Sequence, residues 1–301
     1  MNNEIARIAD VAMFDSKPYE GLQVKLLSMT QNPLRVIATA AEMYRGVVIT
    51  DPSQISRKKA LEWLEDLQRT GTGAPLEFVE FHFLFEGVTR AFTHQLVRQR
   101  IGATYVQESM RFAVKRDAAL AVQTPPSISA LKEDDPKRVL WDAEVKRIGE
   151  TYNALIDAGI PAEDARGLLP TNITTRIHYH TNLRGLREHA GMRLCSQAQY
   201  EWKQVWGQML RAIRNVPYEL DGHSFNEAWQ YDAISKLFKP VCYHTGKCEF
   251  MAATDRFCSI RDRVQAHYAK GEPSSTWGRD IDPLEPLLEG AARKAPAPHE
   301  D

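Results

Sequence analysis

The spacing of hydrophobic residues in the first part of the chain predicts one strand followed by two helices. Residues 22–29 (LQVKLLSM) have the pattern of a strand. Asn32-Pro33 then supplies an N-cap and a first-turn proline for a helix that continues to about Met43. A second helix is expected over about Ser56–Gln68, with the leucines Leu61, Leu64 and Leu67 facing inward.

A second strand and a short helix are predicted next. The break at residues 71–75 (GTGAP) leads into a strand over residues 76–85 (LEFVEFHFLF). Its phenylalanines do not alternate cleanly, which indicates a strand covered on both faces: Phe78, Phe81, Phe83 and Phe85. A helix from about Val88 to Arg98–Arg100 follows.

The rest of the chain has helical spacing and few strands. Residues 113–134 are expected to form a long connection, and Asp135-Pro136 caps a helix that ends before Gly159. One face of that helix carries Trp141, Val145, Ile148, Tyr152 and Leu155. A later stripe predicts a core-facing helix: Ala198, Trp202, Val205, Trp206, Met209 and Ile213.

Composition excludes several classes of protein. The chain has 301 residues, of which 43% are hydrophobic, so it can bury a substantial core in one large domain or two small ones. Its formal charge of -1 provides no basic field for duplex nucleic acid. No window has the apolar run of a signal peptide or a membrane span, and four cysteines are too few for a disulfide framework. We therefore expect a cytoplasmic protein without membrane contacts.

Two arginine-rich segments carry the candidate chemistry. In the second, residues 165–202, Asn182 and Arg193 are eleven positions apart, so on a helix they share one face. With Arg166, this segment offers guanidinium groups to an anionic, planar ligand such as a nucleotide phosphate or a pyrimidine ring. In the first, Arg98 and Arg100 point in different directions on a helix and would serve different ligands or different subunits. A solvated, arginine-rich helix end is the alternative for that segment.

Together the two segments resemble the flavin-dependent thymidylate synthases, the ThyX family. The family signature, Arg-His-Arg followed by a serine, is matched by residues 98–100 and Ser109, with Gln95 upstream and Arg111 two places after the serine. The second segment matches more closely, through residues 160–170 (IPAEDARGLLP), Thr175-Arg176, Asn182-Leu183-Arg184, Arg193 and Ala198-Gln199-Tyr200-Glu201. The resemblance covers residues 22–112 loosely and 160–205 closely.

The resemblance implies an α+β fold, helix-rich with a central, mainly antiparallel sheet, in a homotetramer with shared active sites. It implies methylation of dUMP to dTMP, with FAD as cofactor, methylenetetrahydrofolate as carbon donor and NADPH as reductant. Arg193 and Ser109 would act in catalysis, Ser109 as a positioning hydroxyl. The residues that would bind the nucleotide are Gln95, Arg98, Gln107, Ser109, Arg111, Arg166 and Arg193. Those that would bind FAD are Glu77, Gln99, Arg100, Asn182 and Glu188.

Several positions depart from the family pattern. Gln99 replaces the signature histidine, and eight residues separate Arg100 from Ser109, one more than in the signature. Thr72 and Ala74 replace a histidine and a threonine that usually contact the flavin, and Glu188 replaces an asparagine. Glu188 is either a surface partner of Arg184 or a carboxylate that reads a cytosine amino group. The alternatives are therefore methylation or hydroxymethylation of another pyrimidine deoxynucleotide, such as dCMP, and a nucleotide-binding protein without catalysis.

A cysteine-rich segment follows the region of resemblance. Cys242, His244, Cys248 and Cys258 have the residue types of a tetrahedral zinc site, although their spacing matches no paired CxxC motif. Isolated buried thiols are the alternative. The sequence predicts a catalytic domain over 1–235, a cysteine-rich extension over 236–269 and a mobile tail over 270–301.

Overall fold

A four-stranded antiparallel sheet forms the centre of the protein. The computed structural model describes residues 19–116, 121–195, 198–219 and 227–245. The strands are β1 (Gln23–Met29), β2 (Glu80–Thr89), β3 (Ala103–Gln107) and β4 (Thr174–Asn182), in the spatial order β1-β2-β4-β3. Each neighbouring pair is antiparallel. The predicted strand at residues 22–29 is confirmed as β1.

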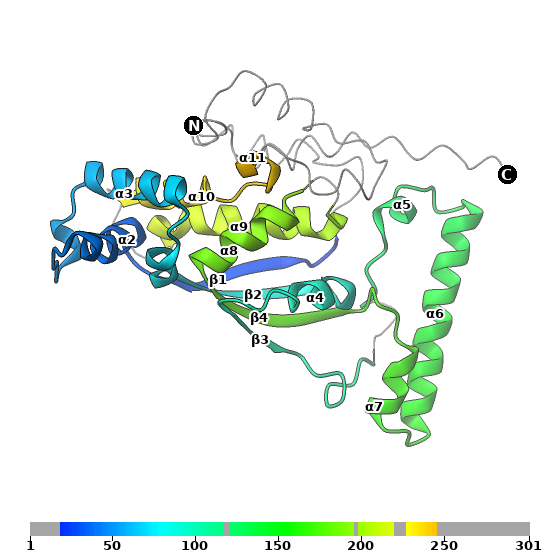
Figure 1. Cartoon of the computed structure of the whole chain (residues 1–301). Coiled ribbons are helices and arrows are strands. Elements are labelled where there is room, and N and C mark those ends of the chain that lie inside the picture. Colours follow the sequence, from blue (N-terminus) through cyan, green and yellow to red (C-terminus); the bar gives the residue numbers. More distant parts are fainter. Residues whose placement is uncertain (1–18, 117–120, 196–197, 220–226, 246–301) are drawn as a thin grey trace.

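Helices cover one face of this sheet (Figure 1). The elements of this layer are α2 (Pro33–Glu42), α3 (Arg57–Thr70), α8 (Leu183–Arg193), α9 (Tyr200–Glu219), α10 (Ala228–Ser235) and α11 (Cys242–Thr245). The short α4 (Arg90–Leu96) follows β2, and the single-turn helices are η1 (Met43–Arg45), η2 (Pro52–Gln54) and η3 (Ala74–Phe78). The main hydrophobic core lies between the helices and the sheet.

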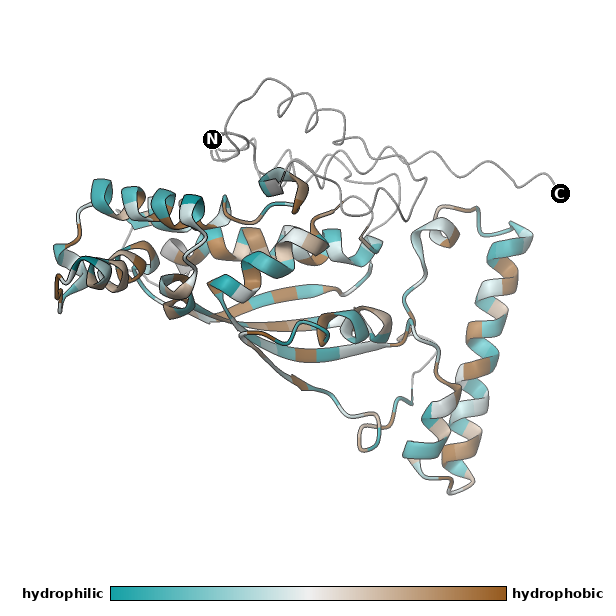
Figure 2. Ribbon diagram, in the orientation of Figure 1, coloured by the Kyte–Doolittle hydropathy of each residue, from teal (hydrophilic) through white to brown (hydrophobic). Residues whose placement is uncertain are grey.

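A second group of helices stands to the side of the sheet. It comprises α5 (Pro126–Ser129), α6 (Pro136–Asp157), α7 (Ala162–Ala165) and η4 (Arg166–Leu168). Asp135 caps α6 by accepting a hydrogen bond from the Lys137 amide, as its sequence predicts. Hydrophilic and hydrophobic residues are mixed along this helix (Figure 2), and of its predicted stripe only Tyr152 is fully buried. None of the described helices combines the length and hydropathy needed to cross a membrane.

The prediction that the phenylalanine-rich strand is covered on both faces is wrong. Phe81, Phe83 and Phe85 alternate along β2 and are all fully buried under the helices. The intervening His82 and Leu84 are only half-buried on the other face. Phe78 spoils the alternation in the sequence because it belongs to η3, before the strand begins, and is 62% exposed.

The predicted cap positions of α2 and α6 are confirmed, although α2 lacks the side-chain hydrogen bond. Asn32 is the N-cap residue and Pro33 lies in the first turn, as predicted, but Asn32 has φ 47° and its side chain makes no cap hydrogen bond. The amide oxygen of Gln230, on α10, instead accepts hydrogen bonds from the Leu34 and Arg35 amides at 3.0 and 3.3 Å. In α3, Ser56 is the N-cap, but Leu61 is 37% exposed and Trp63 takes the inward position.

Candidate active site

Gln95 and Arg193 meet where the end of α8 approaches α4. Arg193 Nη1 donates to Gln95 Oε1 at 2.9 Å, and Nη2 donates to the Gln95 backbone oxygen at 3.5 Å. The guanidinium carbon lies 4.9 Å from the centre of a Trp202 ring, on α9. Trp202 Nε1 donates to the same Gln95 oxygen at 2.8 Å. Three helices thus fix one arginine beside one amide.

The environment of Arg193 favours an acceptor-rich ligand. Burial lowers the pKa of this guanidinium below its usual value. Its Nε is buried and has no hydrogen-bond partner among the described residues. A desolvated cation with an unsatisfied donor gains free energy when an anion or a polarised carbonyl binds to it.

Buried polar groups continue from Gln95 into the core. Gln95 Nε2 donates to Gln199 Oε1, and Gln199 Nε2 donates to Glu201 Oε2 at 3.4 Å. Glu201 is fully buried and accepts from the Thr89 amide at 2.7 Å and the Thr89 hydroxyl at 2.6 Å. Burial raises the pKa of Glu201 to about 7, although the Thr89 hydrogen bonds lower it. Neither Gln199 nor Glu201 was among the predicted site residues.

Arg111, Glu163 and Arg166 form a second cluster, which we call the Glu163 cluster. Arg111 Nε and Nη2 both lie 2.8 Å from Glu163 Oε2, and Arg166 Nε donates to the Glu163 backbone oxygen at 3.1 Å. Ser109 adjoins it, since its Oγ accepts from the Arg111 amide at 3.3 Å. The Arg111 side chain is 54% exposed, so this cluster lies on the surface.

The two clusters occupy different parts of the fold. The Glu163 cluster lies at α7 and η4, beside the end of α6 and away from α8 and α9 (Figure 1). Among the described residues, no hydrogen bond or ion pair joins the Glu163 cluster to Gln95 or Arg193. Two other predicted nucleotide ligands lie nearer α4: Arg98 Nη2 is 3.3 Å from His94 Nε2, and Gln107 donates to Thr93 Oγ1 at 2.9 Å.

Comparison with known proteins shows the family of this chain. The sequence profile described as "Thymidylate synthase complementing protein" matches residues 25–217. A flavin-dependent thymidylate synthase from Geobacter sulfurreducens is 34% identical over 197 residues, covering 65% of this chain and 83% of that protein. Its counterpart from Clostridium tetani is 33% identical over 221 residues, covering 68% and 87%. This chain belongs to the flavin-dependent thymidylate synthase family.

A solved structure supports the same fold. The UMP/dUMP methylase PolB from Streptomyces cacaoi, bound with 5-Br dUMP, aligns with a TM-score of 0.50 and 23% identity. The alignment covers 64% of this chain and 89% of that one. The predicted family, the α+β fold and the assignment as an enzyme are therefore confirmed.

The predicted flavin residues gather at the N-terminal end of α8. Asn182 is the N-cap of this helix, with Oδ1 accepting from the Gly185 amide at 2.9 Å. Because its backbone is extended, the helical spacing that placed Asn182 and Arg193 on one face does not apply to Asn182, and that inference is wrong. Arg184, in the first turn, pairs with Glu77 at 2.6 Å and with Glu188 at 3.6 Å.

The side chains of Gln99 and Arg100 differ in burial near this end of the helix. Gln99 Oε1 accepts from the buried Tyr179 hydroxyl at 2.6 Å, and Gln99 Nε2 is buried without a partner among the described residues. The Gln99 amide therefore points into the protein, whereas Arg100 is exposed. Gly185 makes room for this arrangement, because a β-carbon there would lie 2.7 Å from the Ile101 backbone oxygen.

His189 is a buried base that no sequence motif singled out. It lies on α8 among aromatic rings, with ring centres 4.9 Å from Trp202 and 6.4 Å from Tyr179. Burial, and to a smaller extent Arg193, lower its pKa to about 3. His189 is therefore neutral at physiological pH and leaves Arg193 as the cation next to Gln95.

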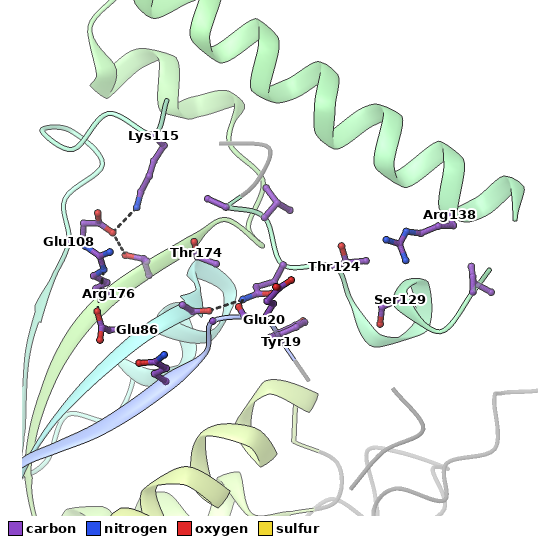
Figure 3. A pocket seen from close by; sticks show the side chains of 18 of the residues that line it. Tyr19, Glu20, Glu86, Glu108, Lys115, Thr124, Ser129, Arg138, Thr174 and Arg176 are labelled. Carbon is purple, nitrogen blue, oxygen red and sulfur yellow. Dashed lines mark hydrogen bonds and ion pairs between the residues drawn. The ribbon is translucent and has the colours of Figure 1, made fainter. Parts of the chain in front are cut away.

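A large cavity lies outside the Gln95–Arg193 site. Its volume is about 730 Å³, and it opens between the ends of β2 and β4 and the region of α5 (Figure 3). Charges of both signs line it, and some already neutralise one another: Lys115 pairs with Glu108 at 2.8 Å, and Arg176 with Glu86 at 3.5 Å. Because positive and negative side chains are balanced, the cavity favours neither an anionic nor a cationic ligand.

The structure does not test the predicted zinc site in full. Cys242 and His244 are described, whereas Cys248 and Cys258 lie outside the described residues. Among the described residues, no group of three or more histidine, cysteine or acidic side chains could hold a metal ion. The first part of the predicted extension packs on the core, through Leu237 and Phe238. The zinc site and the domain boundaries remain predictions.

Proposed function

We propose that this protein methylates dUMP to dTMP, with FAD as cofactor, methylenetetrahydrofolate as carbon donor and NADPH as reductant. The observation that carries the proposal is the partly buried Arg193, held by Gln95 and Trp202 with one donor unsatisfied. Both clusters lie within the range matched by the family profile. We expect the enzyme to work in the cytoplasm.

Arg193 would be the residue that activates the pyrimidine. Its fixed guanidinium can stabilise negative charge that develops on the ring as the new bond forms. Gln95 holds the guanidinium in place and lies within reach of the same ligand. Ser109 would orient the nucleotide, since its Oγ contacts the Arg111 amide and no described base activates it as a nucleophile.

The surface near the N-terminus of α8 fits a flavin. Phe78 and Ile101 are 62% and 71% exposed, and each is adjacent in sequence to a predicted polar contact, Glu77 or Arg100. A flat ring system with polar edges would cover this apolar surface and meet the polar groups around it. Bound FAD, once reduced, would supply the hydride that completes the methyl group. Gln99 is not part of this proposed contact, because its amide points inward.

Active sites shared between subunits of a homotetramer would join the two clusters. Within one chain, Arg166 lies at the start of η4 and Arg111 lies in the loop after β3. Helix α7, which η4 follows directly, is away from α8 (Figure 1). An anionic nucleotide needs cations around its phosphate as well as beside its base. A second subunit that places its Glu163 cluster beside the first subunit's Arg193 would complete such a site.

The test is a direct assay of the product. Purified protein is incubated with FAD, methylenetetrahydrofolate and NADPH, together with either dUMP or dCMP, and the mass of the nucleotide product is measured by mass spectrometry. We expect dTMP from dUMP and a flavin absorption band that persists after desalting. A hydroxymethylated product would support the alternative chemistry, and a colourless protein that makes no product would support a nucleotide-binding role.

Glu188→Gln is expected to leave the choice of base unchanged. Glu188 is 57% exposed and lies 3.6 Å from Arg184, so it is a surface partner of that residue. The free energy of unfolding should change by less than about 1 kcal/mol. The ratio of kcat/KM for dCMP and dUMP, measured beside Glu144→Gln as an exposed control, checks this. A tenfold or larger shift would show that Glu188 reads the base, and a wild-type preference for dCMP would contradict dUMP as substrate.

A further inference from the structure

The hydrogen bonds from Arg193 to Glu201 run in one direction only. Arg193 and the Trp202 indole can donate but cannot accept, so the Gln95 atom between them must be the amide oxygen. The Gln95 NH₂ group therefore faces Gln199, which must present its own oxygen. The Gln199 NH₂ group then faces position 201, which must carry an acceptor.

Glu201 is suited to hold the end of this chain. Its Oε1 accepts from the Thr89 amide, and its Oε2 accepts from both the Thr89 hydroxyl and Gln199. The Thr89 hydroxyl accepts from the Phe92 amide at 3.0 Å, so its proton is directed to Glu201. Above its pKa of about 7, the ionised Glu201 carboxylate offers acceptors alone, whereas the carboxamide of glutamine would present an NH₂ group on one side.

We propose that Glu201 is a positioning residue for the nucleotide site, because its carboxylate fixes the orientation of the Gln199 and Gln95 amides and thereby holds Arg193 in place. The expected effect on nucleotide binding rests on the proposed function. The hydrogen-bond chain itself can be tested without turnover. Glu201 acts through two other side chains and touches neither substrate nor cofactor.

Glu201→Gln should break the orientation. The Thr89 backbone N–H still requires an acceptor, so the oxygen of the new carboxamide takes the position next to it. The new NH₂ group then faces the Gln199 NH₂ group. Relief of that clash turns Gln199 and then Gln95, which brings an NH₂ group against Arg193 and Trp202. At about pH 8.5, where wild-type Glu201 is ionised, we expect the Kd for dUMP to rise at least about tenfold, or about 1.4 kcal/mol, since donors then face donors in a buried site.

Moving the carboxylate should restore the orientation. In the double variant Gln199→Glu with Glu201→Gln, the carboxylate now at position 199 accepts from the carboxamide at position 201 on one side and from Gln95 on the other. We expect dUMP affinity to return to within about threefold of wild type. A carboxylate that only stabilises the fold through Thr89 would not be replaced in this way. Glu42→Gln is the matched control, because Glu42 is 5% exposed and accepts from Trp63 Nε1 at 2.5 Å, away from the site.

Crystal structures of wild type and the variants provide a readout that does not depend on the reaction. We expect the Arg193 guanidinium to leave Gln95 in Glu201→Gln and to return in the double variant. Gln199→Leu keeps Glu201 but interrupts the series of hydrogen bonds, so it should also displace Arg193. This variant tests the proposal even if Glu201→Gln does not fold. The proposal would be overturned if Gln199→Leu kept the wild-type position of Arg193 and the wild-type affinity for dUMP. It would also be overturned if a folded double variant did not regain dUMP affinity. Failure of wild type to bind dUMP would refute the proposed function and leave the structural test intact.

Discussion

Arg193→Ala abolishes turnover and weakens dUMP binding by roughly 2–4 kcal/mol, if the guanidinium contacts the nucleotide as proposed. That range corresponds to a loss of about 30- to 1,000-fold in affinity. The expected effect is large because the substitution removes a cation from a partly buried position. It also removes one of the two side-chain groups that donate hydrogen bonds to Gln95 Oε1, since only Trp202 Nε1 remains. Calorimetric titration with dUMP and measurement of dTMP formation provide the two readouts.

Two further variants sharpen this experiment. Arg193→Lys retains the charge but loses the planar fork that reaches both oxygens of Gln95, so it should restore only part of the affinity. Arg147→Ala removes an arginine that is 68% exposed on α6 and pairs with Glu144. It should leave dUMP affinity and dTMP formation unchanged. Wild-type dUMP affinity in a folded Arg193→Ala protein would remove Arg193 from the site.

Mixed oligomers of Arg166→Ala and Arg193→Ala subunits recover activity that neither variant has alone. Each variant by itself lacks one essential cation in every site. When both subunits are co-expressed equally and assemble at random, about a quarter of shared sites receive both native arginines. Activity of the mixture should therefore rise to about a quarter of wild type, from near zero in either parent.

The control for this result is a mixture made without subunit exchange. Separately purified oligomers that are combined just before the assay should stay inactive, because no new sites form. If co-expressed variants remain as inactive as the parents although mixed oligomers form, then Arg166 and Arg193 serve the same chain's site or Arg166 is not a ligand. That outcome would contradict shared active sites and leave the Arg193 prediction standing.

Local sequence signals predicted the helices well, because caps and hydrophobic stripes act over a few residues. Asp135 caps the helix that follows it, as predicted, and the helix expected from about Ser56 begins at Arg57, with Ser56 as its N-cap. Trp202, Trp206 and Met209 on α9 are buried as their spacing predicts. Strand β4 was not predicted, although Ile177 and Tyr179 alternate with exposed positions along it. Two of its buried positions, Thr175 and Thr181, are polar, so the period-two pattern of apolar residues is weak along this strand.

The sequence by itself determined the family, the residue types of the site and most of the helices, since these depend on motifs and on neighbours along the chain. The tertiary structure alone decided which groups meet. Gln95 and Arg193 are 98 positions apart and are joined only because α4 and α8 converge on α9. The same convergence buries Glu201 against Thr89, which is 112 positions away. Hydrogen-bond direction depends on the donors and acceptors brought together in space, and linear spacing carries no record of them.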